Sequence, residues 1–350
     1  MSQEASTGSI PPAPQDVVMQ MVIGGWVSKT ISEITQLHVP DLVKKHGPST
    51  ALELVERHGV RAHAPSLQRA LRACASLGLF TEDAESRYGP TPLSDALTAD
   101  SPVSIKAITE IFGRSWYTVW GGLGDALRSG EPQPKSRLGA EYWDFLRSNP
   151  KEMEEFGAAM KANSNGSLRG VLELWDFTGV KTVADVGGGF GHLALALLAK
   201  YPELRATVLD MPDLEPIVRA QLPSDPGVTA RFTYQGGEMF ADVPAAEVYV
   251  MKHIIHDWDD ERCVALLQHC VRRMQGDGRV LCVDAVLPPA GDTSGTAAKL
   301  LDINMLVFIP GKERTLAEWT DPYRAAGLRV GHVLPIRDNF GTSIVEGVRA

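Results

Sequence analysis

The chain has 350 residues, of which 44% are hydrophobic and 22% charged, and its net charge is −9. This length suggests about two domains, and the composition is that of a globular protein with a full core. The acidic balance argues against a nucleic-acid or anionic-membrane partner, because both require a basic surface. No segment approaches the roughly 20 apolar residues of a membrane span, and the polar start of the chain lacks a signal-peptide pattern.

The chain contains four cysteines, and none is in Cys-x-x-Cys spacing. A chain of this length does not need disulfides to stabilise it, so we expect reduced core residues in a cytoplasmic protein rather than a disulfide framework or a redox motif. They are Cys74, Cys263, Cys270 and Cys282.

The N-terminal third predicts a small helical domain. Residues 1–15 are polar and rich in Pro and Ser, and we expect them to be disordered. Residues 16–110 show apolar residues near helical spacing, followed by a segment typical of a short hairpin, with residues 88–90 near its turn. Helices followed by a small hairpin indicate a winged-helix pattern.

Residues 111–170 read as a helical linker in which aromatic side chains concentrate. They pack either in a core or interface, or around an aromatic pocket, and the sequence leaves both interpretations open. The aromatic residues are Trp116, Tyr117, Trp120, Tyr142, Trp143 and Phe145.

Residues 171–350 predict an α/β domain. Short apolar runs such as TVADV, RATVLD, EVYVMKHII and RVLCVDAVL alternate with helical segments. Strands alternating with helices predict a Rossmann-like fold with a mainly parallel sheet.

A glycine loop follows the first of these strands, where ligands bind in open parallel sheets. Residues 189–194 fit the dinucleotide fingerprint G-x-G-x-x-A, so an NAD-dependent oxidoreductase is one alternative. Asp185 argues against it, because a carboxylate there repels a pyrophosphate and suits a cationic sulfonium cofactor with an ammonium group. Asp210 ends the second strand and can bind a ribose, which both cofactors carry, or cap the following helix.

His256 lies between a strand and a helix, where a side chain can face a ligand. Histidine can remove a phenolic proton near neutral pH, and Asp284 or Glu313 could orient its ring. The alternative is a capping or solvent-facing residue. His253 and His256 lack a third ligand at helical spacing, so we expect no metal. We also expect a solvent-exposed helix start made by Asp257, Asp259, Asp260 and Glu261.

The motifs ADVGGG, LDMPD, GGEMF, MKHIIHDWDDERC, DAVLP and GKERT occur in that order. In this order they resemble the plant-type phenolic O-methyltransferases and the bacterial relatives that methylate aromatic antibiotics and pigments. The likeness covers about residues 16–348. It implies a winged-helix-like dimerisation domain, a homodimer formed through it, and a Rossmann-like S-adenosylmethionine-binding domain.

The resemblance also implies roles for individual residues. Besides Asp185, the cofactor-binding residues would be Gly187, Gly189, Asp210, Met211, Glu238, Met239 and Lys252. The general base would be His256, flanked by Asp284 and Glu313. Candidate residues for the acceptor pocket are Trp116, Trp120, Phe156, Met160, Asn163, His253, Asn304 and Phe308.

The chain departs from the plant pattern at several positions. Glu238 replaces Asp, Asp284 replaces Glu, and His253 replaces a pocket aromatic. The segment FIPGKERT is one glycine shorter than the plant pattern. Glu238 bears on the adenine contact and Asp284 on the reach to His256, whereas the last two departures concern the acceptor more than the type of reaction.

We therefore expect direct transfer of the sulfonium methyl to a hydroxyl of a small aromatic compound, giving a methyl ether and S-adenosylhomocysteine without a metal. An N- or C-methyltransferase on the same scaffold, or a winged-helix DNA-binding regulator, are the alternatives.

Overall fold

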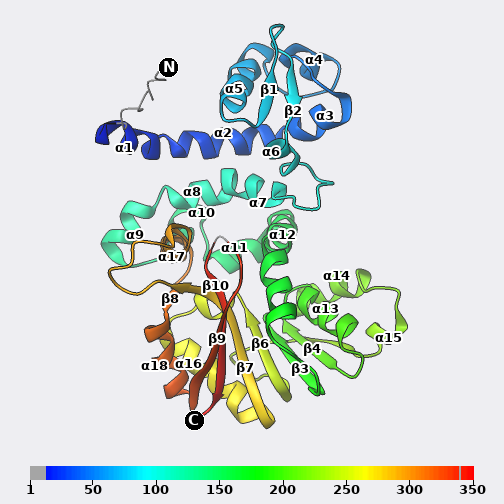
Figure 1. The fold of residues 1–350 in the computed structure, drawn as a ribbon, viewed down its shortest axis with the longest axis vertical. Coiled ribbons are helices and arrows are strands. Elements are labelled where there is room, and N and C mark those ends of the chain that lie inside the picture. The colour runs from blue at the N-terminus through cyan, green and yellow to red at the C-terminus, as the bar shows by residue number, and fades with distance from the viewer. Residues whose placement is uncertain (1–12, 339) are drawn as a thin grey trace, which may run out of the picture. The chain divides into compact units, whose positions relative to one another are not determined.

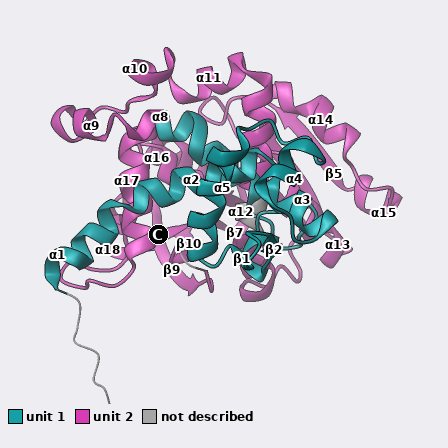
Figure 2. Cartoon of the chain, turned by 90° about the horizontal axis from the view of Figure 1, so that it is seen from above, with its two compact units in different colours: residues 1–117 teal, residues 118–350 magenta. Residues whose placement is uncertain are grey.

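The computed structural model describes residues 13–338 and 340–350, apart from the side chains of residues 161–165. Contact density divides the chain into two compact units, residues 1–117 and 118–350 (Figure 2). The expected disorder of residues 1–15 concerns mainly residues 1–12, which lie outside the described part, and the first helix begins at Pro14.

The first unit is helical with one small hairpin (Figure 1). Its helices are α1 (Pro14–Val22), α2 (Gly24–Gln36), α3 (Val39–His46), α4 (Ala51–Glu56), α5 (Ala64–Ser76), α6 (Pro92–Asp95) and α7 (Lys106–Ile111), followed by the π-helical turn η1 (Phe112–Trp116). Strand β1 (Phe80–Glu82) pairs antiparallel with β2 (Tyr88–Pro90). The hairpin turn therefore lies at residues 83–87, and residues 88–90, expected near it, form the second strand directly after it.

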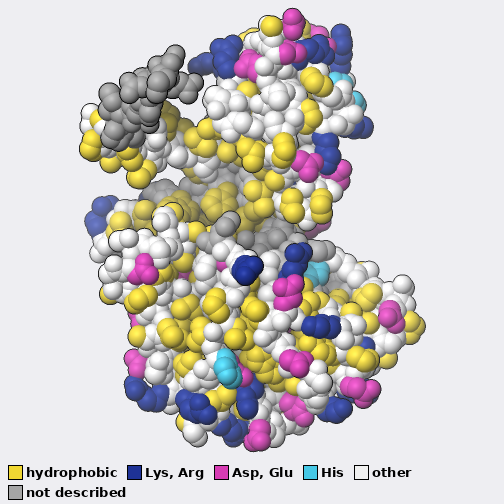
Figure 3. Space-filling view, in the orientation of Figure 1, with side chains coloured by type: hydrophobic (Ala, Val, Ile, Leu, Met, Phe, Trp, Pro, Cys, Tyr) yellow, Lys and Arg dark blue, Asp and Glu magenta, His cyan; other side chains and the backbone are white. Residues whose placement is uncertain are grey.

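Helices α1 and α2 expose large apolar side chains. Thr35, Ile34 and Ser32 are buried on α2, whereas α1 has no buried residue. Figure 3 shows hydrophobic side chains gathered at the surface along these two helices. The exposed apolar residues there are Val18, Met19, Met21, Val22 and Trp26, with Trp26 73% exposed.

The second unit is built on a mixed sheet in the order β5-β4-β3-β6-β7-β10-β9, with β8 paired to β7. Strands β3 to β7 run parallel, and β10 and β9 add an antiparallel edge. The strands are β3 (Thr182–Val186), β4 (Arg205–Asp210), β5 (Phe232–Gly236), β6 (Ala246–Lys252), β7 (Met274–Leu287), β8 (Arg314–Thr315), β9 (Leu328–Pro335) and β10 (Thr342–Arg349).

Helices cover both faces of the sheet (Figure 1). One core cluster joins α12 (Pro150–Leu174), α13 (His192–Lys200) and α14 (Glu215–Ala220) to one face, and another joins α16 (Asp260–Arg273) and α18 (Leu316–Ala325) to the other. Central strands buried on both faces read as continuous apolar runs, which is why β3 and β6 were recognisable in the sequence. The remaining elements are α8 (Tyr117–Trp120), α9 (Leu123–Ser129), α10 (Pro134–Leu138), α11 (Tyr142–Ser148), α15 (Pro226–Thr229), α17 (Thr296–Phe308) and the 3-10 turns η2 (Pro212–Leu214) and η3 (Ile255–Asp257).

The α/β fold predicted from the sequence is confirmed, including its mainly parallel sheet. All four cysteines are free and buried, as expected. Among the described residues, no helix combines the length and the apolar character that crossing a bilayer requires.

Candidate active site

The candidate site lies at the carboxyl edge of the parallel strands. Strand β3 has β4 on one side and β6 on the other, so the chain winds outward in opposite directions from this point. Open sheets bind ligands where the strand order reverses in this way. The glycine loop (residues 187–191) follows β3, and residues 253–257 follow β6.

The glycine loop has a backbone that only glycine adopts readily. Gly187, Gly189 and Gly191 have φ values of 70°, 55° and 74°, in the left-handed region that other residues avoid. A Cβ atom on Gly187 would also collide with the side chain of Ile254, in the segment after β6. The loop therefore brings bare backbone to the edge where a ligand would lie.

Asp210 holds this loop in place. Its Oδ2 accepts a hydrogen bond from the backbone N–H of Gly189 at 2.6 Å, and its Oδ1 accepts from the N–H of Met211 at 2.7 Å. Burial raises the pKa of Asp210 despite these two bonds. The alternative that Asp210 is only a helix cap is not what the structure shows, because one of its bonds reaches back to the glycine loop.

Asp185, at the end of β3, is suited to a cationic ligand group. It is 2% exposed, and its Oδ2 is buried without a hydrogen-bond partner. Burial raises its pKa to about 6, although the positive charge of Lys252 acts in the opposite direction. A buried carboxylate oxygen without a partner is costly, and the ammonium of S-adenosylmethionine would satisfy it. The residues present therefore fit this cofactor.

The other expected cofactor residues lie around the same edge. Glu238 and Met239 follow β5 directly, and the N–H of Gly237 donates to the Asp210 carbonyl at 3.0 Å. Glu238 is exposed, and its charge contributes to the raised pKa of Asp210. Burial lowers the pKa of Lys252, at the end of β6, while Asp185 and Asp284 raise it. Met211 is half-buried and packs against the core.

His256 is held by Glu313. It lies in η3 and is 8% exposed, and its Nδ1 lies 2.6 Å from Glu313 Oε1. Asp284 Oδ1 lies 3.8 Å from the same nitrogen. Burial alone would lower the pKa of His256, but the nearby carboxylates outweigh it and raise the pKa to about 10. The three residues predicted as a catalytic set are thus brought together from segments up to 57 positions apart.

His253 joins the same group from the end of β6. Its φ is 57°, and its N–H donates to the carbonyl of Val283 on β7 at 3.0 Å. Its Nδ1 lies 3.9 Å from Asp284 Oδ1, and its Nε2 lies 3.4 Å from Ser167 Oγ. Burial lowers the pKa of His253 well below its ordinary value, and the charges of Lys252 and His256 act in the same direction. We call His253, His256, Asp284 and Glu313 the acid–base cluster.

Three of the four carboxylate oxygens of the acid–base cluster lack a hydrogen-bond partner. Asp284 is 0% exposed with neither oxygen bonded, and Glu313 Oε2 is also buried without a partner. Burial raises the pKa of Asp284 to about 6. The cluster therefore carries buried negative charge that only the histidines and more distant cations offset.

Asp257 belongs beside this cluster, which corrects the expectation that it forms part of a solvent-exposed helix start. Its side chain is only 13% exposed, and its Oδ1 lies 3.4 Å from His256 Nε2. Burial raises its pKa to about 7, although the charge of His256 lowers it. Asp259 does cap α16, accepting from the N–H of Arg262, as a residue at a helix start would. The feature of the sequence that could have placed Asp257 beside the cluster is its position directly after His256.

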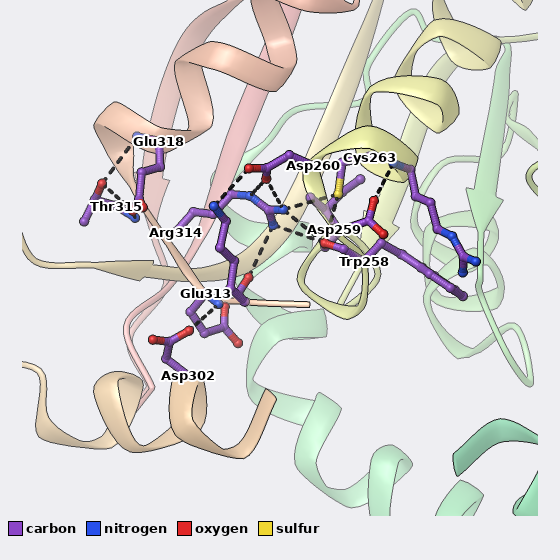
Figure 4. A network of polar contacts seen from close by, with 12 residues as sticks. Trp258, Asp259, Asp260, Cys263, Asp302, Glu313, Arg314, Thr315 and Glu318 are labelled. Atoms are coloured by element: carbon purple, nitrogen blue, oxygen red, sulfur yellow. Dashed lines mark hydrogen bonds and ion pairs between the residues drawn. The ribbon is translucent and has the colours of Figure 1, made fainter. Parts of the chain in front are cut away.

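Arg314, absent from the sequence-based set, holds the segment that carries His256 (Figure 4). Its guanidinium is buried and donates to the carbonyls of Ile255 and Trp258, at 3.2 and 3.1 Å, one on each side of His256. It also donates to Asp260 Oδ1 at 2.6 Å. The feature of the sequence that could have pointed to Arg314 is its position directly after Glu313 in GKERT.

Two expected pocket residues are bonded to each other. The indole Nε1 of Trp120 donates to Oδ1 of Asn304 on α17 at 2.9 Å. This bond fixes the side-chain amide of Asn304 with its NH₂ group directed away from the indole.

Other expected pocket residues form an aromatic group. The ring of Tyr142 lies 5.9 Å from Phe156 and 5.1 Å from Phe308, both edge to face. Met160 is half-buried on α12. Trp116 belongs to the first unit, where its ring packs on Phe112, and the side chain of Asn163 lies outside the described residues.

Comparisons with known proteins agree with this geometry. A family model described as an O-methyltransferase domain matches residues 120–329, and one described as an O-methyltransferase dimerisation domain matches residues 19–100. A phenazine O-methyltransferase from Lysobacter antibioticus is 33% identical over 347 residues, covering 99% of each chain. A mitomycin biosynthesis 6-O-methyltransferase from Streptomyces lavendulae is 32% identical over 329 residues, 92% of this chain and 91% of the relative.

The fold comparison also identifies the cofactor. The solved structure of human N-acetylserotonin methyltransferase in complex with S-adenosylmethionine matches with a TM-score of 0.87 and 26% identity, covering 97% of this chain and 100% of that one. The expected cofactor is thereby confirmed. The chain belongs to the O-methyltransferase family, and it is an S-adenosylmethionine-dependent O-methyltransferase with an N-terminal dimerisation domain.

Proposed function

We propose that the protein methylates a hydroxyl of a small aromatic natural product, such as a fused-ring phenol, with His256 as the general base. The observation that carries this proposal is the 2.6 Å contact between His256 Nδ1 and Glu313 Oε1 at the carboxyl edge of the sheet. S-adenosylmethionine supplies a methyl group already activated by its sulfonium centre, so the protein mainly has to position the acceptor and remove one proton.

The proton transfer follows from the arrangement of His256. When Nδ1–H donates to Glu313, Nε2 is the ring atom that faces the acceptor hydroxyl. The same nitrogen lies 3.4 Å from Asp257 Oδ1, so Asp257 is a carboxylate beside the ring atom that would take the proton. Glu313 and Asp284 orient the ring and stabilise its protonated form once the hydroxyl has lost its proton.

The cofactor is proposed to lie along the glycine loop. Asp185 would bind the ammonium group, and Asp210 would bind the ribose on the side opposite its two backbone bonds. The remaining proposed contacts come from Gly187, Gly189, Met211, Glu238, Met239 and Lys252.

The acceptor is proposed to be planar and aromatic. The edge-to-face group around Tyr142 and the fixed amide of Asn304 offer flat apolar surface and one polar contact. Relatives named as phenazine and mitomycin O-methyltransferases act on fused-ring compounds. In this proposal residues 111–170 contribute to the acceptor pocket and residues 171–350 bind the cofactor.

We also propose a homodimer formed through residues 16–110, in the cytoplasm. The apolar side chains exposed along α1 and α2 support the dimer, because monomeric proteins rarely expose such a patch. The four free, buried cysteines support a reducing compartment. Light scattering at micromolar concentration should give twice the chain mass, and a monomer would contradict the dimer.

The acceptor class is tested by incubating the protein with labelled S-adenosylmethionine and a panel of hydroxyphenazines, hydroxylated polyketide aromatics and simple phenols. We expect transfer to the fused-ring hydroxyls and less to single-ring phenols. Amino analogues of the best acceptor provide the control for N-methylation. Preferred transfer to the amine, or no transfer to any aromatic hydroxyl, would overturn the proposed acceptor class.

A further inference from the structure

We propose that His253, His256 and Asp284 form a binding site for a divalent transition-metal ion, with Zn²⁺ the best match, and that the bound ion blocks methyl transfer. The reaction itself needs no metal in this proposal. The ion acts as an inhibitor at the acid–base cluster.

The ligand atoms already lie close to the required geometry. One nitrogen from each histidine and one Asp284 oxygen all lie within 4.8 Å of one another. The Nδ1–Oδ1 separations to Asp284 are 3.9 Å for His253 and 3.8 Å for His256. Tetrahedral Zn²⁺ with bonds of about 2.0–2.1 Å needs ligand atoms roughly 3.3 Å apart. The two distances to Asp284 must therefore shorten by about half an ångström, and the distance between the two histidine nitrogens by at most about 1.5 Å.

The backbone brings these ligands together from different elements. The parallel pairing of β6 with β7 places Lys252 opposite Val283, so the following residues, His253 and Asp284, emerge side by side. The hydrogen bond from the His253 N–H to the Val283 carbonyl fixes this register beyond the strand end. Sequence spacing alone suggests only the His253–His256 pair, since its third ligand comes from another strand.

The charge of the site favours a cation. Asp284 is fully buried with neither oxygen hydrogen-bonded, and Glu313 Oε2 is also buried without a partner. With both imidazoles in the neutral form that binds a metal, two carboxylates and two imidazoles balance a divalent ion, and Glu313 lies close enough to His256 to take the fourth position. Lys252 and Arg314 lie within electrostatic range of Asp284 and oppose the ion, which limits its affinity and keeps binding reversible.

Inhibition follows from which nitrogen binds the ion. Coordination at His256 Nδ1 displaces the contact with Glu313 and leaves the single proton of the neutral ring on Nε2. A ring in that state cannot accept the proton of the acceptor hydroxyl. This step rests on the proposed role of His256, whereas the metal site itself does not.

The site is tested first by spectroscopy on the whole protein, without acceptor. Titration with Co²⁺ should give the visible absorption of a tetrahedral or five-coordinate site, saturating at about one ion per chain and displaced by Zn²⁺. His253→Asn and Asp284→Asn should weaken binding by at least about tenfold. Asparagine tolerates the positive φ of position 253, so His253→Asn remains informative if Asp284→Asn does not fold.

Two other histidines serve as controls. His269→Gln changes a histidine on α16 that binds Arg272, and His46→Gln breaks the surface pair in which His46 stacks on His58 at 4.1 Å. Both should bind Co²⁺ like the unchanged protein. The proposed site would be overturned by any of three results: loss of binding in His46→Gln, no absorption at saturating Co²⁺, or unchanged binding in both cluster variants.

A second readout tests inhibition separately. Methyl transfer should fall in proportion to metal occupancy and return with a chelator, while S-adenosylmethionine binding measured by calorimetry stays within about twofold. Occupancy without loss of turnover would leave the metal site standing and contradict both the inhibition and the proposed role of His256 Nδ1.

Discussion

The glycine loop and the acid–base cluster lie at the same edge of the sheet, but they are built in different ways. The glycine loop is a short continuous segment whose shape depends on left-handed glycines and on the Gly189 N–H that donates to Asp210. The acid–base cluster joins side chains from three separate segments, and two of its carboxylates have unsatisfied oxygens. A site built from backbone tolerates few substitutions but is recognisable locally, whereas a site built from side chains can change its chemistry by single substitutions.

The largest expected effect concerns the acid–base cluster. His256→Ala should lower turnover by about 10²–10⁴-fold, the usual contribution of a positioned base, while S-adenosylmethionine affinity remains nearly unchanged. Steady-state kinetics and calorimetry on the folded variant measure the two quantities. His269→Ala, on the neighbouring helix, should match the unchanged protein. If His256 only stabilised the chain locally, its loss would cost about 1 kcal/mol of unfolding free energy and leave turnover near normal.

Substitutions that disturb the glycine loop should change the affinity for S-adenosylmethionine and not the methyl-transfer step. Asp210→Ala removes the bonds to Gly189 and Met211 together with the proposed ribose contact. Loss of a charge-assisted bond is worth about 1.5–3 kcal/mol, so the dissociation constant for S-adenosylmethionine should rise roughly 10- to 150-fold. Asp213→Ala, in the same segment but exposed, is the matched control. An unchanged dissociation constant in Asp210→Ala would remove this residue from the cofactor site.

A substitution of Arg314 tests whether the acid–base cluster depends on the hydrogen bonds that Arg314 makes to the segment around His256. Lysine keeps the charge but cannot bond the Ile255 and Trp258 carbonyls and Asp260 at once. Arg314→Lys should lower the free energy of unfolding by about 2 kcal/mol and reduce turnover more than cofactor affinity. Arg324→Lys, in an exposed pair with Asp321, should change stability by less than about 0.5 kcal/mol. Equal effects of the two substitutions in urea unfolding would contradict the supporting role.

The affinity for S-adenosylmethionine should depend on pH through the protonation of Asp185, at the start of the glycine loop. The pKa of Asp185 is raised to about 6 by burial, and the groups acting on it are Lys252, which lowers it, and Asp210, which raises it. As pH falls through about 6, Asp185 gains a proton and loses its attraction for the ligand ammonium. The dissociation constant should therefore rise by about fourfold between pH 7.5 and 5.5. Asp185→Asn should bind weakly with little change over this range, and an equally steep dependence in that variant would assign the titration to another group.

The smallest expected effect concerns the acceptor. Trp120→Phe keeps an aromatic ring but removes the 2.9 Å bond to Asn304. A neutral hydrogen bond is worth about 0.5–1.5 kcal/mol, so the KM for the acceptor should rise about 2- to 10-fold with little change in kcat. Combining it with Asn304→Ala should add nothing further. Fully additive effects of the two substitutions would show that the bond does not position the amide.

The elements readable from the sequence were those with a strong local pattern. Strands β3 and β4 match the predicted runs TVADV and RATVLD residue for residue, because strands buried on both faces carry continuous apolar residues. The apolar residues near helical spacing after residue 15 do not form one helix, because Ile23, immediately before two glycines, separates α1 from α2. Asp257 was assigned to a solvated helix start because acidic residues favour that position, and local pattern carries no information on burial by distant segments.

The sequence by itself therefore determined the parallel sheet, the glycine loop and the prediction that His256, Asp284 and Glu313 form one group. Each of these depends on neighbouring residues or on a recognisable order of motifs. What only the tertiary structure decided was which atoms meet. It set Glu313 as the direct partner of His256 Nδ1, left Asp284 shared between His253 and His256, and bonded Arg314 to the carbonyls on either side of His256. These contacts join residues 28 to 59 positions apart, and they depend on strand register and helix packing that no local pattern records.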